Sequence, residues 1–198
     1  CCSAHQVNVS VSLDEVCDVM NELIKITGAI TALCANSSIH NFTVLPWKEW
    51  RILAWDIRFI SNTPGFQKFA GFAKEPFHSL SHYFSTYWDA PWMVLPPRRD
   101  DEWVMPEEKL NWRDYFQREK VLARKLGGAR VELSPNVHDI NMAMIGMWPY
   151  AKPHLVCDPD KVSVDEFMRH LYEDTLEGYL QDKLLNCSLE IRHLCFYK

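Results

Sequence analysis

Apolar and polar residues alternate from His5 to Val11, and this pattern predicts a short β-strand. Successive side chains of a strand point to opposite faces, so one face of this strand is polar and the other apolar. We expect the apolar face to lie in the core and the polar face at a surface. The polar positions are Gln6, Asn8 and Ser10, and the apolar positions are Val7, Val9 and Val11.

A long amphipathic helix is predicted directly after this strand. The run Ser12-Leu13-Asp14-Glu15 is a capping-box pattern, and Asn36 is a residue type that often ends a helix. Between them the apolar residues recur at helical spacing. They are Leu13, Val16, Cys17, Met20, Leu23, Ile24, Ile30 and Cys34.

Further elements follow without the regular alternation of strands and helices that is typical of a parallel sheet. We therefore predict an α+β fold, mixed and mainly antiparallel, with helices packed on the sheet. The expected helices are 79–88, 111–126, 137–148 and one running from a capping box at Ser163 to Leu185; the expected strands are 91–95 and 131–133, with a surface loop at 98–106.

Composition narrows the possible classes of partner. The chain has 198 residues, of which 47% are hydrophobic and 24% charged, and its net charge is −5. These values fit a single globular domain over 1–198 and argue against nucleic acid or an anionic membrane as partner, since both require clustered Lys and Arg. No apolar run approaches the length of about 18 residues that a membrane span needs.

Two features bear on the cell compartment and point in opposite directions. The seven cysteines include no Cys-x-x-Cys pair, and an odd number is unsuited to a disulfide framework, which favours a reducing cytoplasm. Secretion is the alternative, because the chain carries four Asn-x-Ser/Thr sequons. These sequons begin at Asn8, Asn36, Asn41 and Asn186.

Several motifs occur in an order that resembles the glutamate-cysteine ligase family, in both its plant branch and its bacterial carboxylate-amine ligase relatives. The resemblance covers roughly residues 2–156. It rests on Cys2-Ser3-Ala4-His5-Gln6-Val7-Asn8-Val9, Thr31-Ala32-Leu33-Cys34-Ala35-Asn36-Ser37, Arg51-Ile52-Leu53-Ala54-Trp55-Asp56, Tyr87-Trp88-Asp89-Ala90-Pro91-Trp92-Met93, Trp112-Arg113-Asp114-Tyr115-Phe116 and Ala129-Arg130-Val131-Glu132-Leu133.

The resemblance implies a fold of the glutamine synthetase/glutamate-cysteine ligase type, with the chain corresponding to the C-terminal half of a larger catalytic unit. It also implies an ATP- and Mg²⁺-dependent ligase that forms an amide bond through an acyl phosphate. The most concrete version is γ-glutamyl transfer to cysteine or another amine. The implied partners are an amino acid substrate and either a second chain that supplies the N-terminal half or further copies of this chain.

Site residues follow from the same resemblance. It assigns metal binding to Gln6 and Glu132, catalysis to Glu132 and Arg51, and substrate binding to Asn8, Arg51, Trp55, Tyr87 and Arg130. A forked guanidinium such as that of Arg51 suits a carboxylate. From the residues alone the same positions also fit a solvated edge strand, a surface cation on an aromatic ring, and an exposed Glu.

One departure from the family pattern leaves other functions open. Two residues beyond the metal-binding Glu the family usually has an Arg that contacts phosphate or substrate, and that position is Ser134 here. The alternative of a non-catalytic binding or regulatory member therefore stands. A further alternative is a processed hydrolase in which Cys1 acts as an N-terminal nucleophile.

Overall fold

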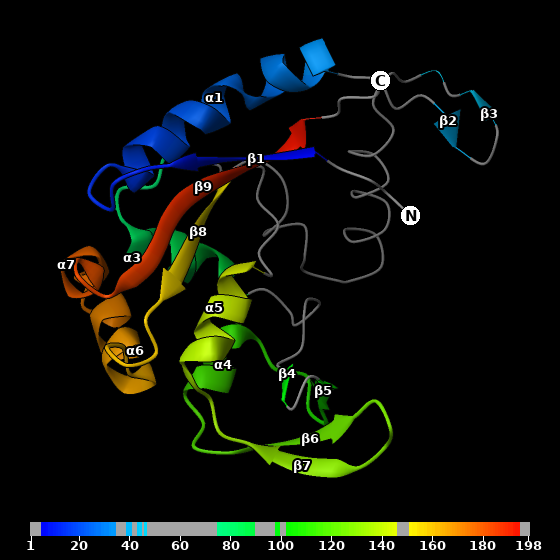
Figure 1. Ribbon diagram of the computed structural model, residues 1–198, viewed down its shortest axis with the longest axis vertical. Coiled ribbons are helices and arrows are strands. Elements are labelled where there is room, and N and C mark those ends of the chain that lie inside the picture. Colours follow the sequence, from blue (N-terminus) through cyan, green and yellow to red (C-terminus); the bar gives the residue numbers. More distant parts are fainter. Residues whose placement is uncertain are drawn as a thin grey trace. The chain divides into compact units, whose positions relative to one another are not determined.

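The computed structural model describes residues 5–34, 39–40, 43–44, 46, 75–89, 98–99, 102–145 and 151–194 (Figure 1). Helices and antiparallel strands are mixed along the chain, so the α+β class is confirmed. The helices are α1 (Val16–Cys34), α3 (Leu80–Tyr87), α4 (Trp112–Phe116), α5 (Val137–Ile145), α6 (Val164–Tyr172) and α7 (Leu176–Leu180). The strands are β1 (His5–Ser10), β2 (Ile39–His40), β3 (Thr43–Val44), β4 (Arg98–Arg99), β5 (Glu102–Pro106), β6 (Val121–Lys125), β7 (Arg130–Leu133), β8 (Ala151–Cys157) and β9 (Leu184–Leu194).

The chain divides into two compact units. Unit 1 comprises Cys1–Pro76, Trp148–Pro153 and Ser188–Lys198, and unit 2 comprises Phe77–Met147 and His154–Cys187. Strands β8 and β9 each have residues in both units. Each unit is described by itself below, and the single domain over 1–198 stays a prediction.

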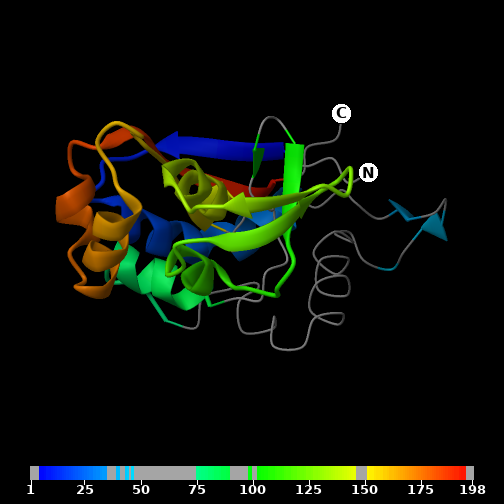
Figure 2. The same ribbon diagram turned by 90° about the horizontal axis from the view of Figure 1, so that it is seen from below.

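Helix α1 of unit 1 begins at Val16, after the predicted capping box, and its first turns follow the predicted apolar spacing. The Ser12 hydroxyl donates to the Glu15 carboxylate, and the helix then begins at Val16. Val16 and Met20 are buried, and so is Thr27, whose hydroxyl donates to the Leu23 carbonyl at 2.6 Å. Figure 2 shows α1 running beside β1 and β9. Although α1 has 19 residues, neither it nor another helix in the described ranges is long and apolar enough to cross a membrane.

Strand β1 lies at the edge of a sheet in the order β1-β9-β8. The expectation that its valine face is buried in the core is wrong, because Val7 and Val9 each remain 38% exposed. Their partners across the strand pair, Ile191 and Leu189, are buried instead. Position in the sheet explains the difference, since a central strand such as β9 is flanked on both sides and an edge strand is not.

The core of unit 2 is an aromatic cluster around Trp88, whose side chain is fully buried. Its ring centroid lies 5.3 Å from that of Phe84, 5.1 Å from that of Phe116 and 5.6 Å from that of Phe167. These rings come from α3, α4 and α6, so the cluster joins helices that are distant in sequence. Such aromatic pairs add stabilisation beyond the area they bury.

The start of α3, which was predicted as a helix over 79–88, is held by two carboxylates. Ser79 caps the helix by accepting from the His82 amide at 3.0 Å, and its hydroxyl donates to Asp174 at 2.5 Å. The Leu80 amide donates to the Glu177 carboxylate. Negative charge at a helix N-terminus is favourable because the free amides there carry partial positive charge.

Replacing Ser79 with alanine is expected to lower the free energy of unfolding by about 1–2 kcal/mol, because the change removes the cap and the donor to Asp174. Urea unfolding measures this loss. Ser163→Ala is the matched control, since Ser163 caps the exposed start of α6 by accepting from the Glu166 amide at 3.2 Å. A loss at Ser79 no larger than that at Ser163 contradicts the role of Asp174.

A four-stranded antiparallel sheet in the order β4-β5-β6-β7 corrects two sequence predictions. The expected surface loop over 98–106 contains β4 and β5. The expected helix over 111–126 ends at Phe116, and β6 begins at Val121. In β6 the buried Val121 and Ala123 alternate with exposed Leu122 and Arg124, which is the period of a strand rather than of a helix. The hairpin to β7 turns at Gly128, whose φ of 91° favours glycine.

The expected helix from Ser163 to Leu185 is also wrong in its second half. The chain leaves the helical conformation at Asp174, whose φ is 55°, forms the short α7, and enters β9 at Leu184. The apolar side chains of this region are buried within unit 2. They are Phe167, Leu171, Leu176 and Leu180.

Burial makes one cysteine thiol unreactive. Cys157 is fully buried in β8, and burial raises the pKa of its thiol to about 12 from an ordinary value near 9. Only the thiolate reacts with disulfide and alkylating reagents. A thiol with pKa 12 holds about a thousandfold less thiolate at pH 8 than one with pKa 9.

We therefore expect Cys157 to be labelled by iodoacetamide at pH 8 about a thousandfold more slowly than an exposed thiol, as followed by peptide mass mapping. The same neutral thiol stabilises the native state fully below pH 9, and this contribution is lost as the pH rises from 9 to 12. Labelling in denaturant is the control, because it should remove the protection. Rapid labelling of the native protein contradicts the burial of Cys157.

Candidate functional site

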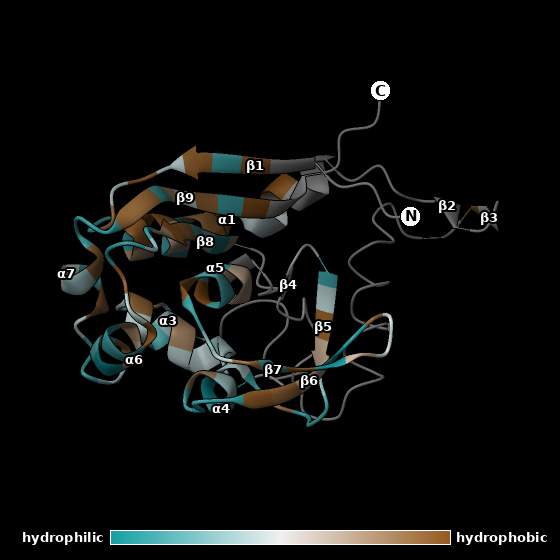
Figure 3. Ribbon diagram, turned by 60° about the horizontal axis from the view of Figure 1, so that its bottom comes forward, coloured by the Kyte–Doolittle hydropathy of each residue, from teal (hydrophilic) through white to brown (hydrophobic). Residues whose placement is uncertain are grey.

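Polar side chains gather on one face of the pair formed by β1 and β9 in unit 1. In this antiparallel pair Asn8 lies opposite Glu190, and Ser10 lies opposite Ser188. Directly opposed residues point to the same face, so these four side chains share it. Figure 3 shows the corresponding hydrophilic bands between hydrophobic ones on both strands.

The polar face contains a buried ion pair. Lys152 of β8 is fully buried, the Glu190 side chain is 7% exposed, and their charged atoms Nζ and Oε2 lie 3.2 Å apart. An isolated charge is costly to bury, and an opposite charge at this distance offsets the cost. The central strand β9 thus carries the Glu190 carboxylate between its two neighbouring strands. Lys152 of β8 pairs with this carboxylate, and Asn8 of β1 lies opposite Glu190.

Of the two β1 residues that the sequence assigned to the site, the structure describes the side chain of one only. Asn8 is exposed on β1. Gln6 belongs to β1, but its side chain lies outside the described residues. The predicted site residues Arg51 and Trp55, and Cys1 of the hydrolase alternative, also lie outside them.

Glu132 and Arg130 lie in unit 2, on the exposed face of β7. Glu132 is paired with Lys120 at 2.9 Å, and both side chains are 58% exposed. The Glu132 carboxylate raises the pKa of Lys120 through a hydrogen bond and charge attraction. Arg130 is paired with Glu107 at 2.9 Å. The two residues share the exposed face of β7, and each is bound to a neighbour of opposite charge.

Tyr87 is a core residue of unit 2 rather than a surface one. It is 5% exposed, and its ring centroid lies 4.9 Å from that of Tyr83 and 6.0 Å from that of Phe77. Burial raises the pKa of the Tyr87 hydroxyl well above its usual range. The assignment of Tyr87 to substrate binding stays a prediction. The buried position of Tyr87 does not support it.

Two of the family-like motifs meet in unit 2. The Arg113 guanidinium binds the Asp89 carboxylate at 2.5 Å and lies over the Tyr172 ring, 5.5 Å from its centroid. The Arg113 amide donates to the Trp88 carbonyl at 3.4 Å. Burial lowers the pKa of Arg113, but hydrogen bonds with Asp89 and Tyr172 outweigh this effect and raise it. These contacts hold α3 to α4, so both motifs have a structural role.

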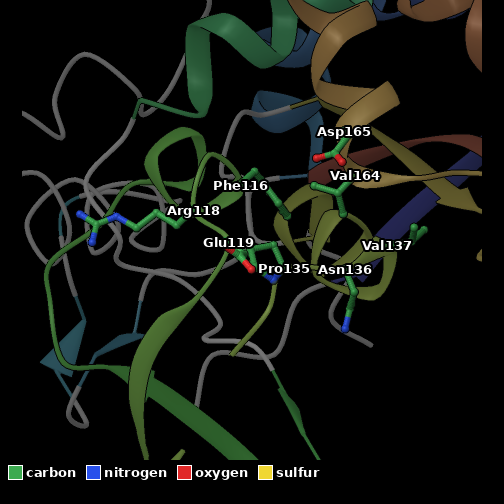
Figure 4. A pocket seen from close by; sticks show the side chains of 8 residues that line it. All are labelled: Phe116, Arg118, Glu119, Pro135, Asn136, Val137, Val164 and Asp165. Atoms are coloured by element: carbon green, nitrogen blue, oxygen red, sulfur yellow. The ribbon is translucent and has the colours of Figure 1, made fainter. Parts of the chain in front are cut away.

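A pocket of about 400 Å³ opens between α4, the start of α5 and the start of α6 (Figure 4). Figure 4 shows the Arg118 side chain extending away from the other lining residues, and its guanidinium binds Glu108 at 3.0 Å. None of the predicted site residues lines this pocket. Its lining residues are Phe116, Arg118, Glu119, Pro135, Asn136, Val137, Val164 and Asp165.

No three His, Cys, Asp or Glu side chains within the described ranges come close enough together to hold a metal ion. Asn8 and Glu190 have the oxygen donors that Mg²⁺ prefers. Of these two residues only Glu190 carries a carboxylate, and that carboxylate is already paired with Lys152. The polar face therefore does not fit a resident divalent metal site in the chain as it stands.

Glu190 is a buried carboxylate on the polar face that the sequence did not single out. The resemblance assigns the site carboxylate to Glu132, and Ser134 stands in the position that it gives to an Arg. A Glu followed two residues later by an Arg occurs twice in the chain, at Glu49 and Arg51 and at Glu190 and Arg192. The spacing alone therefore does not select Glu190, and its place opposite Asn8 follows only from the pairing of β1 with β9.

Comparison of this chain with protein-family models, with curated proteins and with solved structures yields no match.

Proposed function

We propose that the protein is an ATP-dependent carboxylate-amine ligase of the glutamate-cysteine ligase type, with the corresponding fold. Such an enzyme activates a carboxylate as an acyl phosphate, which an amine then attacks. The concrete reaction is γ-glutamyl transfer to cysteine or another amine, in the cytoplasm, with ATP and Mg²⁺ as cofactors. The observation that carries the proposal is the position of Glu190, which lies opposite Asn8 and two residues before Arg192.

The resemblance and the strand pairing together support this position. The resemblance of the N-terminal motif assigns Gln6 to the metal and Asn8 to the substrate pocket. Strand pairing brings Glu190, from the other end of the chain, to the same face as Asn8. A carboxylate followed by an arginine two residues later is the arrangement that the resemblance implies for the reacting phosphate. We therefore assign the site carboxylate to Glu190 in place of Glu132.

Each proposed residue has a separate role in holding the substrates. Arg51 is proposed to grip the carboxylate of the amino acid substrate with two parallel hydrogen bonds, and Trp55 to flank it. Asn8 offers an amide that both donates and accepts. The balanced pair of Glu190 and Lys152 gives the face a fixed arrangement of charge before substrate arrives. No step is assigned to magnesium, because the face does not fit a resident metal.

The proposal is tested by measuring amide product and ADP with the protein purified from its natural source, supplied with MgATP, glutamate and a panel of amines. We expect product formation to require an amine. Glu190→Gln should lower kcat/KM at least about 100-fold, the usual cost of losing a charged group that acts on the transition state.

Glu132→Gln is the matched control, because it removes the exposed carboxylate that faces Lys120. It should leave kcat/KM within about twofold, as expected for a change at a solvent-exposed ion pair. Equal losses in the two variants refute the assignment to Glu190. Absence of any amine-dependent ADP formation refutes the ligase itself.

A second function is favoured by the ion pair of Lys152 and Glu190. A carboxylate that is already balanced by an internal cation suits a member that binds an amino acid without turning over ATP. Such a member is recognised by a rise in melting temperature with glutamate or cysteine, since a ligand that binds the native state stabilises it. ADP formation in the same sample distinguishes the ligase.

A further inference from the structure

We propose that the outer edge of β1 pairs with the same strand of a second copy of this chain, in antiparallel orientation about a two-fold axis at Asn8. The two β1 strands then lie side by side and join the copies as a homodimer. The inference goes beyond the proposed function and does not depend on it, because it concerns the edge of β1 and not the chemistry of its polar face.

The outer edge of β1 is open in the folded chain. β1 pairs with β9 on one side, and the described residues place no strand on its other side (Figure 3). Residues 7–10 are all exposed, although successive side chains point to opposite faces. The residues opposite them in the flanked strand β9, 188–191, are all buried. The open edge therefore offers backbone amides and carbonyls that a further strand can bind.

β1 differs from the other outer strands because it lacks the features that block pairing. Folded proteins protect open edges with charged side chains, with proline or with very short strands. β7 carries Arg130 and Glu132, and β8 carries Lys152 and Pro153. The strands β2, β3 and β4 have two residues each. Among the outer strands that the structure describes, β1 is the one that has six residues and no Lys, Arg, Asp, Glu or Pro.

The sequence of β1 fits pairing with itself. A two-fold axis between antiparallel strands places one residue opposite its own copy and keeps like faces together. With the axis at Asn8, Asn8 lies opposite Asn8, and Val7 lies opposite Val9 of the second copy. The two amides can bond to each other, and the four valines form one apolar group. This group covers Val7 and Val9, which are each 38% exposed in the single chain.

Charge favours a second copy over a strongly acidic or basic partner. The five paired residues, 6–10, contain no ionisable side chain, so they offer no opposite charge to a strand rich in Lys or Glu. A second copy brings the same alternation in matching register and places no like charges together. Because one strand pair buries a small area, we expect a weak dimer that forms as the protein concentration rises.

Sedimentation equilibrium of the full chain tests this dimer from about 10 μM to 1 mM, the range in which a small interface associates. The average mass of the wild type should rise from that of the monomer toward twice that value. Val9→Lys places a charge on the edge at a partly exposed position and should stay monomeric. Far-ultraviolet circular dichroism shows whether this variant is folded.

Leu122→Lys is the matched control for Val9→Lys. It introduces the same charge at an exposed apolar side chain, but Leu122 lies in β6, which is flanked by β5 and β7. We expect this variant to dimerise as the wild type does. A difference between the two lysine variants therefore reports on the edge of β1 and not on the added charge.

Cysteine substitutions test the position of the axis. Two copies of Asn8→Cys meet at the axis, where opposed Cα atoms lie about 4.5–5.5 Å apart, within reach of a disulfide. Ser10→Cys is the matched variant, because its two copies are offset by four positions along the strand, about 13 Å, which is too far. Both positions are exposed. Under mild oxidation, Asn8→Cys should form a covalent dimer on a non-reducing gel, and Ser10→Cys should form no more than the wild type with its native cysteines.

Four results overturn the inference. The first is a wild-type protein that stays monomeric up to about 1 mM. The second is equal dimerisation of folded Val9→Lys and Leu122→Lys. The third is a yield of covalent dimer from Asn8→Cys no larger than that from Ser10→Cys, and this comparison decides the question if Val9→Lys does not fold. The fourth is a different chain that purifies with the wild type and that Val9→Lys releases, because the edge is then occupied by another protein.

Discussion

Replacing Trp88 with alanine is expected to lower the free energy of unfolding by about 3–5 kcal/mol, the usual cost of removing a large buried aromatic side chain. Trp88 is fully buried and packs on Phe84, Phe116 and Phe167, so the cavity lies where three helices meet. Denaturant unfolding followed by far-ultraviolet circular dichroism measures the loss. A loss below 1.5 kcal/mol, the level of a well-tolerated core substitution, contradicts the central position of Trp88.

Trp88→Phe is the informative companion to this variant. Within the described residues the Trp88 Nε1 group is buried and has no hydrogen-bond partner, and a buried donor in that state is destabilising by about 1–3 kcal/mol. Phenylalanine removes the donor and keeps an aromatic ring. Removing the unpaired donor therefore partly offsets the cost of the smaller ring. We expect Trp88→Phe to lower the free energy of unfolding much less than Trp88→Ala does.

Breaking the pair of Lys152 and Glu190 is expected to have a similarly large effect on stability. Lys152→Met fills most of the lysine's volume but removes the cation that lies 3.2 Å from the buried Glu190 carboxylate, and losing one partner of a buried ion pair costs about 3–5 kcal/mol. The double variant Lys152→Met/Glu190→Leu removes both charges. It should recover most of the loss, because buried ion pairs are often no more stabilising than apolar residues of similar volume.

Urea unfolding of the wild type, both single variants and the double variant forms a thermodynamic cycle that isolates the coupling between the two charges. Strong coupling is the expected result. Simple addition of the two single losses in the double variant contradicts it, and shows that the charges do not compensate each other. Lys161→Met is a control, because Lys161 is 57% exposed and its pairing with Asp158 should contribute less than about 1 kcal/mol.

Local signals in the sequence predicted the starts of helices better than their ends. Ser79, Asn111 and Ser163 each cap the helix that the sequence assigned to them. A cap depends on a side chain that bonds to an amide two or three residues away, so it can be read from a short window. The end of the helix beginning at Asn111 depends on β6 pairing with β5 and β7, which no local pattern reveals.

The polar face of β1 was predictable from alternation alone, and its buried partners were not. Asn8 could be assigned to a polar side, but nothing near it in the sequence indicates Glu190 or Lys152. Both are charged residues, and their mutual contact, which depends on the order β1-β9-β8, offsets the cost of burying them. Residues of this kind become visible only once strands distant in sequence are paired.

The pairing of β1 with β9 has a consequence for synthesis of the protein on the ribosome. Ser10 is synthesised roughly 10–40 s before its partner Ser188 at ordinary elongation rates. During that interval β1 has an unsatisfied edge that can pair with strands of other nascent chains. The polar side chains along β1 reduce that hazard, and the protein should depend on chaperones more when translation is slowed before β9.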